Sequence, residues 1–234
     1  MRRMLIIHPQ WPPSNLVGVH RVRLIANELN ALGWHPIVLT IDERDYEESL
    51  SYETLKLVSS SVEVIRVRAK PVRSILGKRL VGDISLRGWS ALKEKAESIL
   101  SNQKVDFIWF SLPPWYTSVI GRLLKRKFNV PFGIDYRDPW IFERADHQKG
   151  FNRALATAII ARILEPVALK NVSLISGVSV GYLDGVMKRY HGVQSIPNVT
   201  FQMGFAHRDH HIELPEFRPP FQHDKRTYVY AGAH

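Results

Sequence analysis

The stretch VPFGIDYRDPW at residues 130–140 decides the fold that the sequence predicts. Its first half is apolar enough for a buried strand, and three charged residues follow at once: Asp135, Arg137 and Asp138. A parallel α/β sheet explains this order, because its strands are buried on both faces and its ligands bind outside their carboxyl ends. The stretch therefore predicts a buried strand that delivers a polar group to one edge of a sheet.

Apolar strands alternate with helical periodicity on both sides of this stretch. The expected strands cover residues 4–8, 35–41, 62–67, 105–111, 130–136, 172–179 and 193–198. Helices are expected from His20 to a C-terminal cap at Gly33, in the basic stretch 71–100, and over residues 119–128, 151–170 and 180–190. This alternation predicts a Rossmann-like α/β domain, with an open, mostly parallel sheet and helices on both faces.

The last part of the chain changes character. Residues 1–200 carry the α/β pattern, whereas residues 201–226 are polar and rich in proline, which is typical of a linker. TYVYAG at 227–232 then begins another strand. The sequence therefore predicts that residues 227–234 start a C-terminal domain that is missing here.

Composition limits the classes of function. The 234 residues include 32 Lys and Arg against 22 Asp and Glu, so the net charge is +10 and favours anionic partners. The chain has no cysteine, which excludes disulfides, zinc–thiolate sites and cysteine nucleophiles. No apolar run approaches the roughly 18 residues of a membrane span, and no signal peptide is visible. These features predict a cytoplasmic protein.

Two further loops are expected at the same sheet edge, after the first and fourth strands. The first leads into a helix whose start carries His20, Arg21 and Arg23, and cations there oppose the helix dipole. A bound anion would reverse that penalty, and Gly18 would allow its close approach. The alternative is that these side chains point into solvent.

The polar group at 135–138 also has two interpretations. It lines a substrate cleft, or it is a structural Asp–Arg pair that ties the strand to a neighbouring loop. Trp140 forms a cleft wall or, more simply, belongs to the core. The turn SLPP at 111–114 connects a strand to a helix. The histidines of HRDHH at 207–211, with His223, match no standard metal-site spacing, so no metal is expected.

Taken in order, these pieces resemble the N-terminal half of a retaining glycosyltransferase of the two-domain GT-B fold, and in particular the large family-four group. The resemblance rests on PPSNLVGVHRVRLIANELNALGWHPIVLT at 12–40, SLPP at 111–114, PFGIDYRDPW at 131–140, LISGVSVGYLD at 174–184 and SIPNV at 195–199. Two features depart from the family pattern. Many relatives carry a histidine near Arg137 and Asp138, and the family has glycine where Val199 stands.

The resemblance implies an acceptor-binding domain that works with a nucleotide-sugar domain across a cleft. It places Asp135, Arg137 and Asp138 in that cleft as catalytic candidates, with Asp138 in the role of the absent histidine. It implies substrate contacts at Gly18, His20, Arg21, Arg23, Ser111, Pro113 and Trp140. It implies no metal or other cofactor, because cations and helix N-termini can stabilise the leaving diphosphate.

The implied activity is sugar transfer from a nucleotide-sugar to a saccharide or lipid-linked acceptor, as in cell-envelope polysaccharide synthesis. The family's donor-binding Arg/Lys pair and paired glutamates are not found in residues 1–234, so the chain alone is expected to be inactive. The basic stretch 66–95 suggests peripheral contact with the inner face of a membrane, or simply covers the sheet as helices. The alternative function is a non-catalytic basic module for an anionic partner such as nucleic acid, although no nucleic-acid motif is present. The oligomeric state stays open.

Overall fold

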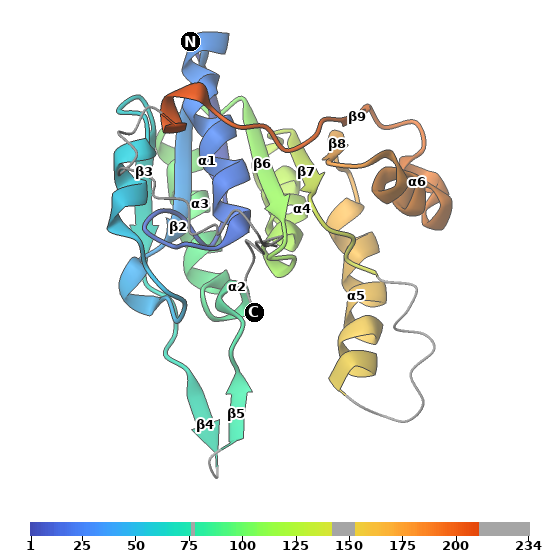
Figure 1. Ribbon diagram of the computed structural model, residues 1–234. Helices are drawn as coiled ribbons and strands as arrows, with labels where there is room; N and C mark the ends of the chain where they lie inside the picture. Colours follow the sequence, from blue (N-terminus) through green and yellow to red (C-terminus); the bar gives the residue numbers. More distant parts are fainter. Residues whose placement is uncertain (76–77, 142–152, 211–234) are drawn as a thin grey trace, which may run out of the picture. The chain divides into compact units, whose positions relative to one another are not determined.

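The structure is a computed structural model that describes residues 1–75, 78–141 and 153–210 (Figure 1). The chain divides into a compact unit, Met1–Gly204, and a second unit that begins at Phe205. The described part of the second unit ends in a 3₁₀ turn, His207–His210. Most of the predicted linker, 211–226, and the predicted strand 227–232 lie outside the described residues.

A seven-stranded parallel sheet forms the centre of the first unit and confirms the predicted fold class. Its order is β3-β2-β1-β6-β7-β8-β9, and each neighbouring pair is parallel. The strands are β1 (Arg2–Ile7), β2 (Trp34–Ile41), β3 (Glu63–Val67), β6 (Phe107–Leu112), β7 (Phe132–Tyr136), β8 (Leu174–Gly177) and β9 (Asn198–Thr200).

The last strand lies later than the sequence predicts. We expected a strand over 193–198, but His191–Val193 is a 3₁₀ turn and β9 spans Asn198–Thr200. Pro197 offers the sheet only its carbonyl, which accepts from the Ile175 N–H, because proline has no N–H for the ladder. The pairing of β9 with β8 therefore begins at Asn198, the residue after Pro197.

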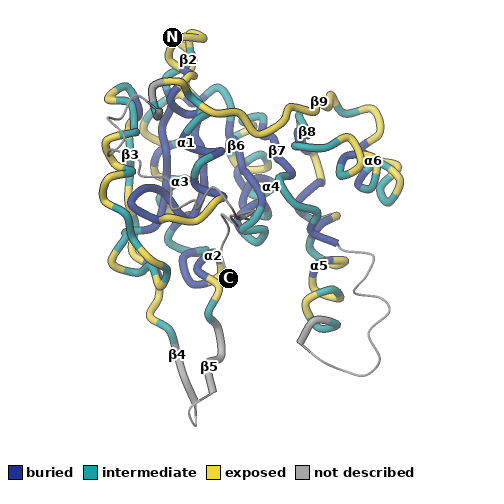
Figure 2. Tube along the Cα trace, in the orientation of Figure 1, coloured by how far each residue is buried: buried dark blue, intermediate teal, exposed yellow. Residues whose placement is uncertain are grey.

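Helices cover both faces of the sheet, as predicted. Helix α1 (Val17–Leu29) packs on one face through Val22, Ala26 and Leu29, and Gly33, with a positive φ of 81°, follows the 3₁₀ turn that extends it. Helices α3 (Trp89–Asn102) and α4 (Val119–Phe128) cover the other face. Figure 2 shows the central strands as the most buried part of the chain.

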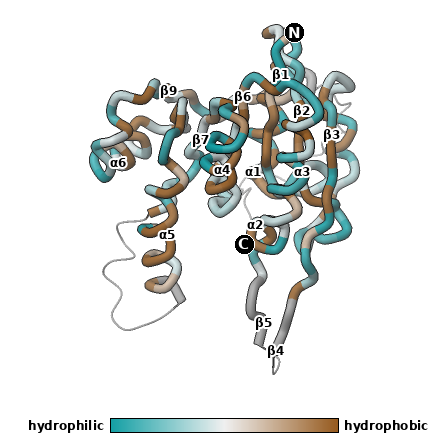
Figure 3. The backbone as a smooth tube through the Cα atoms, turned by 180° about the vertical axis from the view of Figure 1, so that it is seen from behind, coloured by the Kyte–Doolittle hydropathy of each residue, from teal (hydrophilic) through white to brown (hydrophobic). Residues whose placement is uncertain are grey.

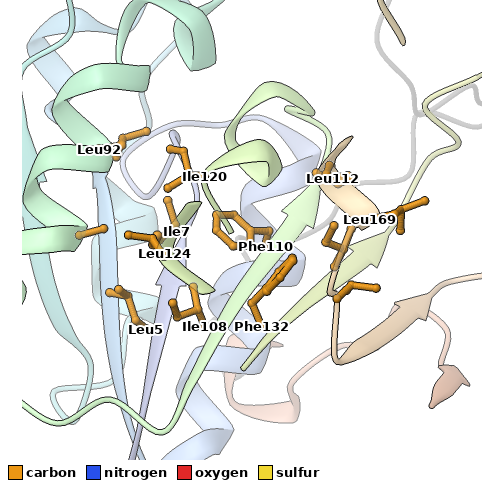
Figure 4. Close-up of a cluster of buried hydrophobic side chains, with 14 of the residues drawn as sticks. Leu5, Ile7, Leu92, Ile108, Phe110, Leu112, Ile120, Leu124, Phe132 and Leu169 are labelled. Atoms are coloured by element: carbon orange, nitrogen blue, oxygen red, sulfur yellow. The ribbon is translucent and has the colours of Figure 1, made fainter. Parts of the chain in front are cut away.

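The larger of two hydrophobic clusters lies between the sheet and α3 and α4 (Figure 4). Leu5 and Ile7 of β1 point into it, whereas Ile6 points into the smaller cluster under α1. This alternation is what a strand buried on both faces requires, because successive side chains face opposite sides. The labelled members are Leu5, Ile7, Leu92, Ile108, Phe110, Leu112, Ile120, Leu124, Phe132 and Leu169.

The basic stretch 71–100 becomes helical in its later part, as predicted, but the alternative in which 66–95 simply covers the sheet as helices is wrong for its first part. An antiparallel hairpin forms from β4 (Arg73–Ile75) and β5 (Lys78–Val81). A short helix, α2 (Ile84–Arg87), begins only after Asp83, whose carboxylate accepts from the N–H groups of Ser85 and Leu86. Such an N-cap fixes where a helix starts, so residues before it are available for the hairpin.

Two helices complete the unit. Helix α5 (Arg153–Leu169) leads into β8, and α6 (Val180–Arg189) leads toward β9. Both confirm predicted helices over the residues that the structure describes. Ser179 is the N-cap residue of α6, but its side chain makes no capping hydrogen bond.

Candidate functional site

The strand order reverses between β1 and β6, which makes that edge a topological switch point. From β1 the chain continues to β2 on one side, and β6 begins the series on the other side. Open parallel sheets bind ligands outside the carboxyl ends of the strands at such a point. The loop from His8 to Leu16 and the turn from Pro113 to Trp115 leave the sheet there.

His8 joins these two loops. Its side chain is buried, with Nδ1 2.6 Å from the Gln10 carbonyl oxygen and Nε2 3.4 Å from the Pro113 carbonyl oxygen. The shorter distance favours the tautomer that carries its proton on Nδ1. Burial, with a smaller contribution from the charge of Arg137, lowers the pKa of His8 to about 4, so the ring is neutral at pH 7.

Asp135 lies at the centre of a closed hydrogen-bond network. Its side chain is fully buried, and its two carboxylate oxygens accept from Nε and Nη2 of Arg21, each at 2.8 Å. The hydroxyl of Ser111 donates to one oxygen at 3.0 Å, and the hydroxyl of Ser176 donates to the other at 2.8 Å. Strands β6, β7 and β8 and helix α1 are thus tied together at one carboxylate.

Arg21 also reaches the segment after β9. The carbonyl oxygens of Phe201 and Gln202 accept from its guanidinium at 3.4 Å, and its Cζ lies 4.2 Å from the centre of the Phe201 ring. The predicted Asp–Arg pair therefore exists, but its arginine comes from α1 rather than from position 137. Arg21 is a buried structural group and does not point into solvent.

Arg137 and Asp138 are the charged groups of the stretch that reach the surface. The Arg137 side chain is 16% exposed, and its Nε lies 3.5 Å from a carboxylate oxygen of Asp138, which is 44% exposed. Its guanidinium packs against Gly18, because a Cβ at Gly18 would lie 2.1 Å from Nη1. The absence of a side chain at Gly18 is what lets the cation approach the first turn of α1.

The start of α1 is electropositive. Its N-cap residue, Leu16, makes no side-chain capping bond, and its first turn holds no acidic residue. Arg137 adds a full positive charge where backbone N–H groups already point outward. This combination suits an anion at the switch point.

The other predicted substrate contacts on α1 do not share one environment. Arg21 and Arg23 lie in the second turn and not in the first, because α1 begins at Val17. Arg23 is buried and donates to the Leu57 carbonyl at 3.2 Å, on the side of the following loops. His20 is half-buried in the first turn and is the member of this group that stays near the electropositive end.

The remaining predicted substrate contacts have different surroundings. They are Ser111, Pro113 and Trp140. Ser111 is part of the Asp135 network, and Pro113 carries the carbonyl beside His8. Trp140 is buried in the core, where its ring meets that of Tyr116 edge-on at 6.1 Å. Trp140 therefore belongs to the core and does not form a cleft wall.

Buried side chains hold the loop after β1 in place. Glu48 accepts from the Gln10 amide at 2.9 Å and from the Ser14 hydroxyl at 2.6 Å. The Tyr46 hydroxyl accepts from the Trp11 N–H at 2.9 Å. Residues from His8 to Ser14 are buried, so this loop is a preorganised wall of the site.

Sequence reasoning missed His8 and Ser176 as site residues. Both follow the strand-end rule, because His8 comes directly after β1 and Ser176 is the last residue but one of β8. Position was therefore an available signal, but serine and histidine at strand ends are too common to select by type alone.

A surface hollow of about 450 Å³ lies at the opposite edge of the sheet. It is lined by residues at the amino ends of β1 and β2, among them Arg3, Trp34 and Asp106. Its place at the amino ends separates it from the switch point. Among the described residues, no three side chains of the metal-binding types gather as a metal site, and no described helix is long and apolar enough to cross a membrane.

Comparison with solved structures identifies the fold. The chain is similar to sucrose-phosphate synthase from Thermosynechococcus elongatus, with a TM-score of 0.60 and 14% identity over 88% of this chain and 49% of that one. It is also similar to apo UGT2 of Phytolacca americana, with a TM-score of 0.56 and 12% identity over 86% and 51% of the two chains. A shorter piece of the same synthase is matched over 90% of its length, with a TM-score of 0.54. No protein-family profile and no curated protein sequence matches the chain.

The chain therefore has the fold of the N-terminal, Rossmann-like half of GT-B glycosyltransferases. It spans about half the length of the first of these structures.

Proposed function

We propose that this chain is the acceptor-side half of a GT-B glycosyltransferase that moves a sugar from a nucleotide-sugar to a saccharide or lipid-linked acceptor. One observation carries the proposal: the Arg137 guanidinium is held against Gly18 at the uncapped start of α1, at the switch point of the sheet. The leaving diphosphate of such a reaction gains negative charge. A cation beside a helix N-terminus stabilises that charge without a metal.

The residues take distinct roles in this proposal. Arg137 contacts the diphosphate or an acceptor phosphate, and the exposed carboxylate of Asp138 orients the acceptor hydroxyl. Asp135 is a positioning residue, because Arg21, Ser111 and Ser176 already occupy its oxygens and its side chain is fully buried. His8 supports the wall between the first and fourth loops in its neutral form.

The same edge offers a surface for a second domain. Leu16 and Val17 at the start of α1 and Val180 at the start of α6 are exposed apolar residues, and both helices follow the carboxyl ends of strands. In a GT-B enzyme this edge faces the nucleotide-sugar domain. The retaining stereochemistry, the cell-envelope acceptor and the cytoplasmic location follow from the family-four resemblance and the composition, and are part of the proposal.

The test uses the gene's full-length product and measures release of nucleoside diphosphate from a panel of nucleotide-sugars with saccharide and lipid extracts. We expect Arg137→Ala to lower the rate by about 100-fold without changing the urea midpoint of unfolding. Gly18→Ala should act in the same direction, because its methyl group displaces the guanidinium.

Gly181→Ala is the matched control. Gly181 is also the second residue of a helix, but the nearest atom to an added Cβ is 3.7 Å away. Release that is absent with every donor, or equal in Gly18→Ala and wild type, would refute the proposal. Sugar transfer by residues 1–234 alone would contradict the half-enzyme assignment.

A further inference from the structure

The last strand of the sheet holds the chain only weakly at the point where the chain leaves the first unit. Strand β9 (Asn198–Thr200) has three residues, all of them exposed, and it forms the edge of the sheet beside β8. Unlike the central strands, it contains no hydrophobic run (Figure 3). A strand this short makes few ladder hydrogen bonds and buries little apolar surface. The position of the residues after β9 therefore depends on further contacts.

Arg21 supplies these contacts to residues 201–203, which we call the exit segment. Its guanidinium donates to the carbonyl oxygens of Phe201 and Gln202 at 3.4 Å. Its Cζ lies 4.2 Å from the centre of the Phe201 ring, and its Nη1 lies 3.9 Å from Sδ of Met203. Each hydrogen bond is long, but one planar cation contacts three consecutive residues and stacks on an aromatic ring.

The other side of the same guanidinium is fixed inside the protein. Nε and Nη2 of Arg21 donate to the Asp135 carboxylate at 2.8 Å, and the two side chains are 2% and 0% exposed. Arg21 cannot leave this position without stranding a buried charge. The Phe201 N–H also donates to the Gly177 carbonyl, at the end of β8, at 3.0 Å. The exit segment is thus attached to the rigid part of the sheet.

This attachment stops one residue before the boundary between the two units. The first unit ends at Gly204, and the second begins at Phe205. Gly204 is exposed, and a Cβ added there would meet no atom within 4 Å. A glycine with nothing packed against it can change φ and ψ at low cost, as a hinge residue requires.

We propose that Arg21 clamps the exit segment, so that the hinge between the two units is Gly204 and not the end of β9. Asp135, which holds Arg21, lies two residues before Arg137 at the end of β7. The fixed side of the hinge therefore keeps a constant position relative to the candidate site. The clamp and the hinge stand by themselves. Only their use, to keep a nucleotide-sugar domain within reach of Arg137, rests on the proposed function.

The experiment is residue-resolved hydrogen–deuterium exchange on residues 1–234. In the wild type, the Phe201 N–H should exchange roughly 100-fold more slowly than the Gly204 N–H, because exchange reports how often each part of the backbone opens. This difference in exchange rate locates the hinge without any substitution. Equally slow exchange at Phe201 and Gly204 would show that the clamped part extends past Gly204 and would refute the hinge.

Arg21→Lys tests the clamp. Lysine keeps a cation for Asp135 but lacks the planar fork that serves a carboxylate and two carbonyls at once. The Phe201 N–H should then exchange at least about tenfold faster. The Arg137 N–H, which donates to the Leu112 carbonyl at 3.0 Å within the sheet, should keep its rate and shows that the fold is intact.

Two further variants make the test specific. Arg23→Lys is the matched control, because Arg23 is also a buried arginine of α1 but donates to the Leu57 carbonyl. It should leave exchange at Phe201 unchanged. Phe201→Leu removes the ring from the guanidinium at a position that is 39% exposed, so it tests the clamp even if Arg21→Lys unfolds. It should also speed exchange at residue 201.

Wild-type exchange rates at residue 201 in both Arg21→Lys and Phe201→Leu would overturn the clamp. An equal acceleration by Arg23→Lys would do the same, because it would show a general loosening of α1. Exchange is measured without sugar transfer, so failure of the clamp is distinguishable from failure of the proposed activity.

Discussion

Asp135 and Arg21 neutralise each other inside the protein, and their pairing makes a prediction about stability. Asp135→Ala leaves the Arg21 guanidinium buried beside two serine hydroxyls without its carboxylate. We expect a loss of about 3–5 kcal/mol in the free energy of unfolding. Arg21→Met with Asp135→Leu removes both charges and should recover at least half of that loss. Urea unfolding of the single variants and the double variant measures these losses in the free energy of unfolding. A double variant that loses as much as the single variants do together would contradict the prediction.

His8 predicts a pH dependence of stability. Its pKa is about 4 in the folded protein against an ordinary 6.5, so the unfolded chain binds more protons between these values. Stability from this group is therefore complete above pH 6.5 and declines as the pH falls toward 4, by about 3 kcal/mol in all. His8→Asn keeps a donor for the Gln10 carbonyl and should flatten this part of the curve. Equal slopes for the variant and the wild type between pH 4 and 6.5 would refute the assignment.

At the scale of elements, Glu165 joins α5 to β7 and α6. Its carboxylate accepts from the Tyr136 hydroxyl at 3.2 Å, the Tyr190 hydroxyl at 2.9 Å and Arg189 at 3.2 Å. Glu165→Ala leaves these donors unpaired and should cost about 3 kcal/mol of stability. Glu94→Ala, at an exposed position of α3, is the control and should change little. Chemical denaturation measures both.

The same residue should show the opposite pH behaviour from His8. Burial raises the pKa of Glu165 despite the neighbouring Arg189. The folded state then holds the proton more tightly than the unfolded state, so this group favours folding most at low pH and less as the pH rises through its folded pKa. Glu165→Gln should remove that decline, which the pH dependence of the unfolding free energy would show.

The sequence predicts the elements to different extents. Strands β1, β2, β6 and β7 each contain a short apolar run, and such runs are typical of strands buried on both faces. The β4–β5 hairpin is missed because its strands are too short for a clear period. The exposure of Ile159, Ile160 and Ile163 on α5 is missed because the helix is apolar almost throughout, so periodicity cannot show which side is buried.

The site is less predictable than the fold. The strand-end rule places Asp135, Arg137 and Asp138 at the correct edge, but it cannot show which of them pairs within the protein. Arg21 lies 114 residues from Asp135 in the sequence, and no local pattern reports a contact of that separation. The approach of Arg137 to Gly18 is equally non-local.

For the whole molecule, the boundary at Gly204 predicts where the chain can be shortened. Residues 1–204 keep the sheet and the core, and should unfold at the same urea concentration as the full chain. Residues 1–200 lose the carbonyls of Phe201 and Gln202 that accept from Arg21, and should be less stable by about 1–3 kcal/mol. Equal midpoints for the two truncations would show that this contact adds nothing.

The two outer strands of the sheet have a consequence for solubility. Strand β3 has five residues and includes Glu63 and Arg66, and β9 has three residues, each of them exposed. Edge strands that are short or charged give a neighbouring molecule few backbone groups to pair with, which suppresses edge-to-edge aggregation. Mutations that lengthen β9 with apolar residues should therefore promote fibrillar association at high concentration, even where they leave the sheet itself more stable.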